Sequence, residues 1–267
     1  MLYSVAAAAM FYAVFIGALY SGQRRLLYNP DQTVPDPVFY GARDMAAVRV
    51  PTADGLSLYA WWRAPANATK PVLVYFHGNA GHIGDRSGKI RPVLDAGYGV
   101  LLMSYRYNAG AGGSPSEAGL FLDGEAAIQF MAATGYGAGR LVMYGESLGS
   151  GVAVAMAVRH EVAALVVEAP YTDMGDLAQH HYWYAPARWL LKDRFNSAAR
   201  IGRVKAPVLV FHGGRDRVIP QRYGRALYEL APQPKEFQSI DHGAHNDLYD
   251  HGAARVVLEF LDRNVAR

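Results

Sequence analysis

The chain has 267 residues, enough for one large α/β domain and few for two independent ones. Its formal net charge is only +3, and no run of Lys or Arg could follow a phosphate backbone, so we expect no nucleic-acid partner. The absence of Cys excludes disulfides, a thiolate nucleophile and a Cys-ligated zinc site.

The first 22 residues form an uncharged, largely apolar segment, about as long as a helix must be to cross a bilayer core. Tyr3 and Tyr20 stand near its ends, where aromatic side chains favour the headgroup region. No basic residue precedes the apolar run, as a signal peptide would require, although a buried helix is an alternative. We therefore predict a single-pass membrane anchor at residues 1–22. Arg24 and Arg25 follow it, so the positive-inside rule places the rest of the chain in the cytoplasm.

A connector and a hairpin come next. Residues 23–45 contain Pro and Asp and are expected to connect the anchor to a single domain at residues 46–267. Residues 46–50 and 56–62 are rich in strand-forming side chains, and an Asp-Gly turn signal separates them. The domain is therefore predicted to begin with an antiparallel hairpin.

Short apolar runs then alternate with segments of helical composition. Nearly continuous apolar runs indicate strands that are buried on both faces, as in a parallel sheet covered by helices. The fold class is therefore predicted to be α/β, with a mostly parallel sheet and helices on both of its faces. The predicted strands are residues 72–76, 100–103, 141–144, 164–167, 208–211 and 236–240, and the predicted helices are residues 117–133, 150–160 and 252–264.

The segment at residues 173–196 departs from this alternation, because it is far more aromatic than a connecting loop needs to be. Ligands of open α/β sheets bind outside the carboxyl ends of the strands, where this segment emerges, so we predict a lid over the site. Tyr182, Trp183 and Trp189 are its candidate substrate-pocket residues. An insertion that only packs against the core is the alternative.

A nucleophile motif follows the third of these predicted strands. Residues 145–149 read Gly-Glu-Ser-Leu-Gly, which matches the pattern G-x-S-x-G. In that pattern a strand turns sharply into a helix with the serine at the apex, so small residues are needed two positions to either side. A predicted strand precedes the motif here, and a helix rich in small residues follows it. Ser147 is therefore the predicted nucleophile.

A serine nucleophile needs a base, and the base needs a carboxylate to orient it; at such a turn the chain order is Ser, acid, His. Asp216 and His245 each follow a predicted strand, so both are expected at the sheet edge that carries the serine. We assign Asp216 as the acid and His245 as the base. Asp241 and His242 are the alternatives, and His212, at a strand end, is interpreted as a buried core histidine.

The oxyanion of an acyl-transfer intermediate needs hydrogen-bond donors. The backbone N–H of Leu148 is predicted to be one, and the loop after the first parallel strand is predicted to supply another through the N–H of Asn79. An ordinary glycine-rich turn is the alternative for that loop. The chain contains neither a P-loop nor a dinucleotide-binding motif, and we expect no metal or other cofactor.

Five motifs in a fixed order give the chain a specific resemblance. They are residues 76–81, 113–120, 145–149, 213–216 and 243–247, and residues 23–28 after the apolar segment add to them. Together they resemble the α/β-hydrolase-domain serine hydrolases with one N-terminal membrane span, a group often labelled serine aminopeptidase-like. The resemblance implies the α/β-hydrolase fold, a membrane anchor and hydrolysis of acyl esters or thioesters, with a lipid or an acylated protein as the candidate substrate. Residues 104–109 depart from the small, glycine-bearing turn usual in that group. The resemblance therefore does not predict the shape of the adjoining pocket wall.

The sequence thus predicts a serine hydrolase that cleaves esters or thioesters through an acyl-enzyme and prefers medium or long acyl chains. The alternative enzyme is a peptidase that releases N-terminal residues, which would need Glu146 or Glu168 to hold the substrate ammonium group. The non-enzymatic alternative is an inactive hydrolase scaffold that binds partners at a membrane. Such a scaffold would not need an intact set of Ser147, Asp216 and His245.

Overall fold

A computed structural model describes residues 2–67 and 69–265, and within them eight strands form one sheet in the order β1-β2-β4-β3-β5-β6-β7-β8. β1 pairs with β2, and β2 with β4, in antiparallel orientation, whereas the pairs from β4 to β8 are parallel. The strands are β1 (Ala46–Pro51), β2 (Ser57–Arg63), β3 (Val72–Phe76), β4 (Gly99–Met103), β5 (Leu141–Glu146), β6 (Ala164–Glu168), β7 (Val208–Gly213) and β8 (Lys235–Ile240).

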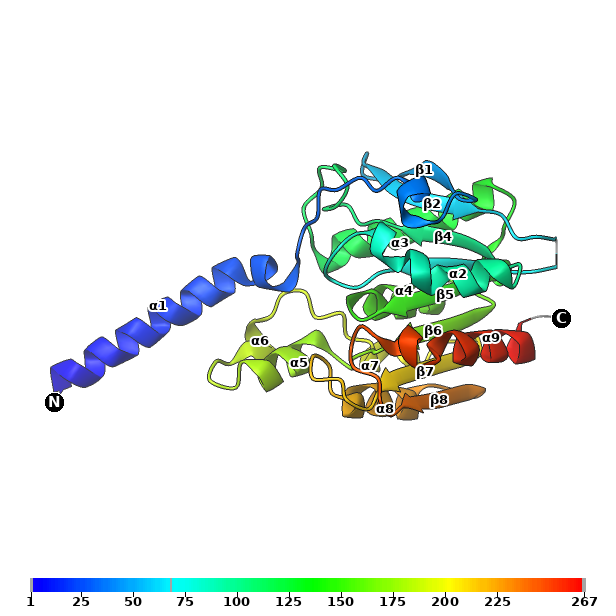
Figure 1. Ribbon diagram of the computed structural model, residues 1–267. Coiled ribbons are helices and arrows are strands. Elements are labelled where there is room, and N and C mark those ends of the chain that lie inside the picture. The colour runs from blue at the N-terminus through cyan, green and yellow to red at the C-terminus, as the bar shows by residue number, and fades with distance from the viewer. Residues whose placement is uncertain (1, 68, 266–267) are drawn as a thin grey trace.

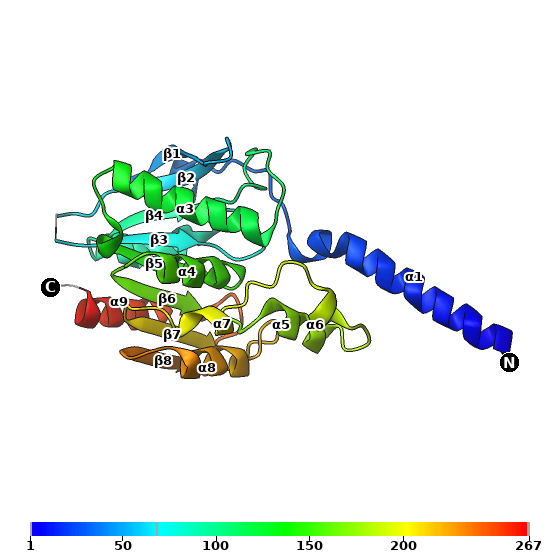
Figure 2. The same cartoon turned by 180° about the vertical axis from the view of Figure 1, so that it is seen from behind.

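Helices cover both faces of the sheet (Figures 1 and 2). α2 and α9 pack on one face, and α3, α4, α7 and α8 pack on the other, each layer around its own cluster of buried side chains. These helices are α2 (Ser87–Asp95), α3 (Glu117–Ala133), α4 (Leu148–Arg159), α7 (Ala198–Ile201), α8 (Gln221–Leu230) and α9 (Ala253–Asn264). Short 3₁₀ helices lie at η1 (Pro37–Tyr40), η2 (Ile83–Arg86), η3 (Ala138–Arg140) and η4 (Leu248–His251).

The predicted α/β architecture is confirmed. The hairpin and the six predicted strands after it are present, and β3, β4, β5 and β6 are buried along their whole length because helices cover both faces. α2 and α8 were not predicted. Gly88 and Pro92 lower the helix propensity of α2, and Gly224 lowers that of α8. Packing of both helices against the sheet outweighs this local preference.

The N-terminal helix α1 (Leu2–Leu27) projects from one side of the domain (Figure 1). Tyr3–Leu27 is long and apolar enough to cross a membrane, and its most apolar stretch has a mean hydropathy of 1.7 and is 0% buried. The helix is longer than predicted, so the predicted connector at residues 23–45 begins inside it. The charged side chains there end the apolar run but not the helix, because Gln, Arg and Leu are good helix formers. Gln23 on α1 and Tyr28 directly after it are buried, so the end of α1 is part of the folded domain.

The predicted insertion contains two helices, α5 (Met174–His181) and α6 (Ala187–Leu190). Both lie beside the C-terminal part of α1 in the two opposite views (Figures 1 and 2). The guanidinium of Arg24 on α1 lies 2.7 Å from the carboxylate of Asp193, whose side chain is only 5% exposed. The insertion therefore connects the N-terminal helix to the edge of the sheet.

Candidate active site

Ser147 lies at the turn between β5 and α4, with a backbone φ of 50° and ψ of −117°. A positive φ is rare for a residue with a side chain and marks local strain that the surrounding structure must hold. A Cβ atom at Gly149 would overlap the backbone oxygen of Phe76, and one at Gly145 would lie 2.5 Å from the backbone oxygen of Gly149. The two glycines are therefore a steric requirement of the turn that presents the serine.

Three predicted side chains come together at this turn. His245 Nε2 lies 3.0 Å from Ser147 Oγ, and His245 Nδ1 lies 2.7 Å from Asp216 Oδ2. The hydroxyl thus engages one nitrogen of the imidazole, and the carboxylate engages the other. The three residues meet because they follow β5, β7 and β8, and parallel strands have their carboxyl ends at one edge of the sheet.

Several donors surround the Asp216 carboxylate. Its Oδ1 accepts hydrogen bonds from the backbone N–H groups of Val218 and Ile219, each at 2.8 Å. His212 is buried, as predicted, and its Nε2 lies 3.2 Å from Asp216 Oδ2. Burial alone would raise the pKa of the Asp216 carboxyl, but contacts with His212 and His245 outweigh it and hold that pKa well below its usual range. Asp216 therefore stays ionised at neutral pH.

The alternative acid and base lie outside this arrangement. Asp241 and His242 are both exposed. The Asp241 carboxylate accepts a hydrogen bond from Ser239, and Nδ1 of His242 lies 3.1 Å from the guanidinium of Arg215. These contacts leave His245 as the histidine that reaches Ser147.

The two predicted oxyanion donors border the same cavity as Ser147. Leu148 is the first residue of α4, so its N–H has no partner within the helix and lies at the positive end of the helix dipole. Asn79 lies in the loop after β3, where its side-chain Oδ1 accepts a hydrogen bond from the N–H of Asn29 at 3.0 Å. That bond joins the loop to the chain that follows α1.

A buried cluster of charged side chains adjoins the nucleophile. Glu146 accepts hydrogen bonds from Nε and Nη2 of Arg86 at 3.1 and 3.2 Å and from the hydroxyl of Tyr75 at 2.9 Å. Lys89 Nζ lies 3.3 Å from Glu146 and 2.6 Å from Glu168. Burial alone would raise the pKa of Glu146, but the charges of Lys89 and Arg86 outweigh it and lower that pKa. The negative charges of the two carboxylates are therefore balanced by cations of this chain.

The cavity beside Ser147 has a volume of about 300 Å³. Its walls combine polar side chains with apolar ones from α1, α5 and the loop after β7, so the cavity suits a reacting carbonyl that carries an apolar group. The polar lining includes Asn79, Arg86, Glu146, Ser147, His245 and Asn246, and the apolar lining includes Leu27, Met174, Leu177, Val218 and Ile219.

The structure does not bring the two predicted tryptophans to this cavity. Trp183 and Trp189 are each 79% exposed and are not among the residues that line it. Tyr182 lines a neighbouring apolar pocket instead. These aromatic residues lie beyond the C-terminal end of α5, whereas Met174 and Leu177, closer to its start, reach the cavity. The insertion therefore contributes Met174 and Leu177 to the cavity at Ser147, which corrects the predicted lining by Trp183 and Trp189.

Sequence relatives cover nearly the whole chain, although no family model matches it. An uncharacterised protein of Mycobacterium tuberculosis is 35% identical over 266 residues, which cover 97% of this chain and 92% of that protein. Protein bem46 of Schizosaccharomyces pombe is 28% identical over 94% of this chain and 89% of its own length. The lysophosphatidylserine lipase ABHD12 of Danio rerio is 33% identical over 195 residues, which cover 66% of this chain and 51% of that protein.

The fold is shared with solved esterases. The esterase Pf2001 of Pyrococcus furiosus superposes with a TM-score of 0.70 and 20% sequence identity, over 89% of this chain and 100% of that chain. The esterase domain of a Rhodothermus marinus protein superposes with a TM-score of 0.65 over 83% of this chain. As the motifs predicted, the chain belongs to the α/β-hydrolase family, among the homologues of bem46 and ABHD12.

Proposed function

We propose that this protein is a serine hydrolase of carboxylic esters or thioesters, with Ser147 as nucleophile, His245 as general base and Asp216 as the acid that orients the base. The observation that carries the proposal is the continuous row of contacts from Ser147 Oγ through His245 to Asp216, at 3.0 and 2.7 Å. Its homologue ABHD12 is named a lipase and its structural neighbour Pf2001 an esterase, which supports an ester substrate.

In the proposed mechanism, His245 takes the proton of Ser147 Oγ while that oxygen attacks the substrate carbonyl carbon. The carbonyl oxygen becomes an oxyanion, which the N–H groups of Leu148 and Asn79 stabilise. The imidazolium then donates its proton to the leaving alcohol or thiol, and an acyl-enzyme remains. Water then attacks the acyl carbon while His245 takes its proton, and the imidazolium returns that proton to Ser147 Oγ as the bond to the acyl group breaks and the carboxylic acid leaves. The ionised Asp216 stabilises the imidazolium in both halves of the reaction.

The buried charges favour an ester over an N-terminal peptide. An aminopeptidase needs an acidic side chain that is free to hold the substrate ammonium group. Glu146 and Glu168 are the two carboxylates considered for that role, and both are buried and paired with cations of this chain. If either carboxylate bound a substrate ammonium group instead, the buried Arg86 and Lys89 would lose part of the negative charge that balances them, which is costly.

Ester hydrolysis should therefore exceed aminoacyl-anilide hydrolysis. We expect kcat/KM of the purified full-length protein to be at least tenfold higher for p-nitrophenyl esters than for aminoacyl-p-nitroanilides. Release of nitrophenol and of nitroaniline can be followed in parallel with the same enzyme preparation. Faster cleavage of the anilides would contradict the esterase and support the peptidase. No turnover of either substrate would support the inactive scaffold.

We also propose that α1 anchors the protein in a membrane as a single span. The support is the length and mean hydropathy of Tyr3–Leu27 and the complete exposure of its most apolar stretch. Exposed apolar side chains surround the helix, as on a span that faces lipid. Arg24 and Arg25 lie in the last turn of α1, and the positive-inside rule then puts the hydrolase domain on the cytoplasmic side.

Charged residues in the middle of α1 should release the protein from membranes. Phe11 and Val14 are 75% and 66% exposed, and a Lys at the centre of a span costs about 3 kcal/mol of insertion free energy. We expect wild-type protein to resist alkaline carbonate extraction and the double variant Phe11→Lys/Val14→Lys to enter the soluble fraction. Phe11→Leu/Val14→Leu is the matched control. Equal partitioning of the wild type and the Lys variant would contradict the anchor.

The chain contains no cysteine, so one introduced cysteine can report the orientation. Lys205 is 79% exposed in its side chain and lies on the hydrolase domain. In Lys205→Cys, an impermeant maleimide should label the protein only when it has access to the cytoplasmic face. Labelling from the opposite face of sealed cells would reverse the proposed orientation.

A further inference from the structure

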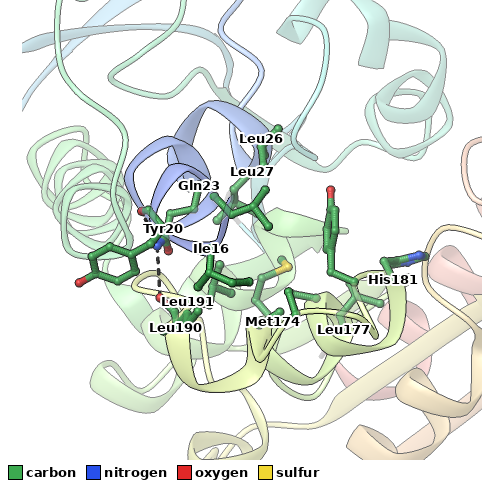
Figure 3. A pocket seen from close by; sticks show the side chains of 15 residues that line it. Ile16, Tyr20, Gln23, Leu26, Leu27, Met174, Leu177, His181, Leu190 and Leu191 are labelled. Atoms are coloured by element: carbon green, nitrogen blue, oxygen red, sulfur yellow. Dashed lines mark hydrogen bonds between the residues drawn. The ribbon is translucent and has the colours of Figure 1, made fainter. Parts of the chain in front are cut away.

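A second pocket, with a volume of about 170 Å³, lies between α1 and the α5–α6 insertion (Figure 3). Figure 3 shows side chains of Ile16 on α1 and of Leu177, Leu190 and Leu191 on the insertion gathered around it. The lining is almost entirely aliphatic and aromatic. A pocket with such walls suits an apolar ligand, because little polar surface has to be desolvated when the ligand binds.

The apolar pocket adjoins the cavity of the nucleophile. Leu27, Met174 and Leu177 line both the apolar pocket and the cavity that contains Ser147 and His245. These three side chains therefore form a common boundary, and the apolar pocket lies on its far side from the nucleophile, beside α1.

The wall that α1 contributes is fixed to the domain. Gln23 donates a hydrogen bond from Nε2 to the carbonyl of Leu190 at 3.2 Å, and its Oε1 accepts one from the N–H of Lys192 at 2.7 Å. The next residue, Arg24, forms its ion pair with the buried Asp193. α1 therefore has a defined position against the insertion, as the wall of a binding site requires.

The pocket also lies beside the part of α1 that we place in the bilayer. The hydroxyl of Tyr12 donates a hydrogen bond to the carbonyl of Tyr184 at 2.9 Å, so the loop after α5 runs alongside α1 as far as Tyr12. Tyr12 lies roughly 22 Å from Leu27 along the helix axis, well inside a membrane span. Irregular backbone at that depth needs its polar groups satisfied, and the Tyr12 hydroxyl does this for Tyr184.

A hydrocarbon chain fits this pocket better than a peptide does. A peptide would bring backbone N–H and C=O groups that need partners when they are buried. The amide of Gln23, a polar group of the lining, is already engaged by Leu190 and Lys192, and Nε2 of His181 lies 2.8 Å from the carbonyl of Val218. A saturated chain needs no such partners.

The geometry points to an acyl-chain site: the chain of a lipid ester enters from the bilayer beside α1, lies between α1 and α5–α6, and brings its carboxyl end past Leu27 and Leu177 to Ser147. This inference rests on the proposed ester hydrolysis. It adds that the anchoring helix is one wall of the substrate site, so the substrate reaches the nucleophile without leaving the membrane.

Filling the pocket should remove the preference for long acyl chains. Four added methylenes favour an octanoyl over a butanoyl ester by roughly 10²-fold in kcat/KM if the pocket buries them. Ala178 lines the apolar pocket but not the cavity at Ser147, and Ala178→Trp should reduce this ratio at least tenfold. The assay uses full-length protein in phosphatidylcholine vesicles. Leu230→Trp places a similar bulk at an exposed position on α8, outside the pocket, and should keep the wild-type ratio. An unchanged ratio in Ala178→Trp would overturn the inference.

A photoreactive probe tests the same site in the unaltered protein. A dodecyl fluorophosphonate with a diazirine at the end of its chain should attach to Ser147 and, after irradiation, crosslink to residues 16–27 or 174–191, as read by peptide mass spectrometry. Attachment to Ser147 with crosslinks only elsewhere, or only to lipid, would overturn the acyl-chain site and leave the hydrolase proposal intact. A probe that does not attach to Ser147 would overturn the proposed function and this inference with it.

Discussion

Ser147→Ala should abolish covalent labelling by fluorophosphonates and lower kcat for ester hydrolysis roughly 10⁴-fold or more. The reason is geometric: the strained turn between β5 and α4 holds the Ser147 hydroxyl 3.0 Å from His245 Nε2. No acyl-enzyme forms without that hydroxyl. The activity that remains would come from substrate binding and the oxyanion donors alone.

Ser150→Ala is the matched control for this substitution. Ser150 lies one turn away on α4, and its buried hydroxyl donates to the backbone oxygen of Ser147 instead of facing His245. It should keep fluorophosphonate labelling, and thermal unfolding should show that both variants are folded. Labelling that persists in Ser147→Ala would remove Ser147 from the role of nucleophile.

The parts of the site that could be predicted from sequence depend on local constraints. The turn allows no Cβ atom at Gly145 or Gly149, so the need for small residues appears directly in the spacing of the motif. Asp216 follows an apolar run and His245 follows a less apolar one, and parallel strands bring such positions to one edge of the sheet. The strands were predictable because helices bury both of their faces.

The cations near the nucleophile were not predicted, because their contacts are distant in sequence. Arg86 lies 60 residues before Glu146, on a helical segment that carries no recognisable motif. One signal was present: a glutamate inside a buried strand needs a cationic partner. That signal indicates that a partner exists but does not say which Arg or Lys provides it.

The aromatic insertion shows a second reason why part of the structure could not be predicted from the sequence. A run of aromatic residues predicts burial against protein, yet Trp183 and Trp189 are exposed, in an insertion whose helices lie beside α1 (Figure 1). In the membrane that we propose for α1, the partner that buries these side chains is lipid, which a fold prediction does not include. The same helix, which we predicted only as an anchor, contributes Leu27 to the cavity at Ser147.

His245→Ala should lower kcat nearly as much as Ser147→Ala, and the double variant should be no worse than either single one. Triad members act as one unit, so the losses from their removal do not add. His242→Ala should keep most of the activity, because His242 is exposed and contacts Arg215 rather than the nucleophile. The measurement is kcat for a short p-nitrophenyl ester in each variant. Similar losses in His242→Ala and His245→Ala would leave the base unassigned, and a double variant far worse than Ser147→Ala would mean that His245 acts apart from the serine.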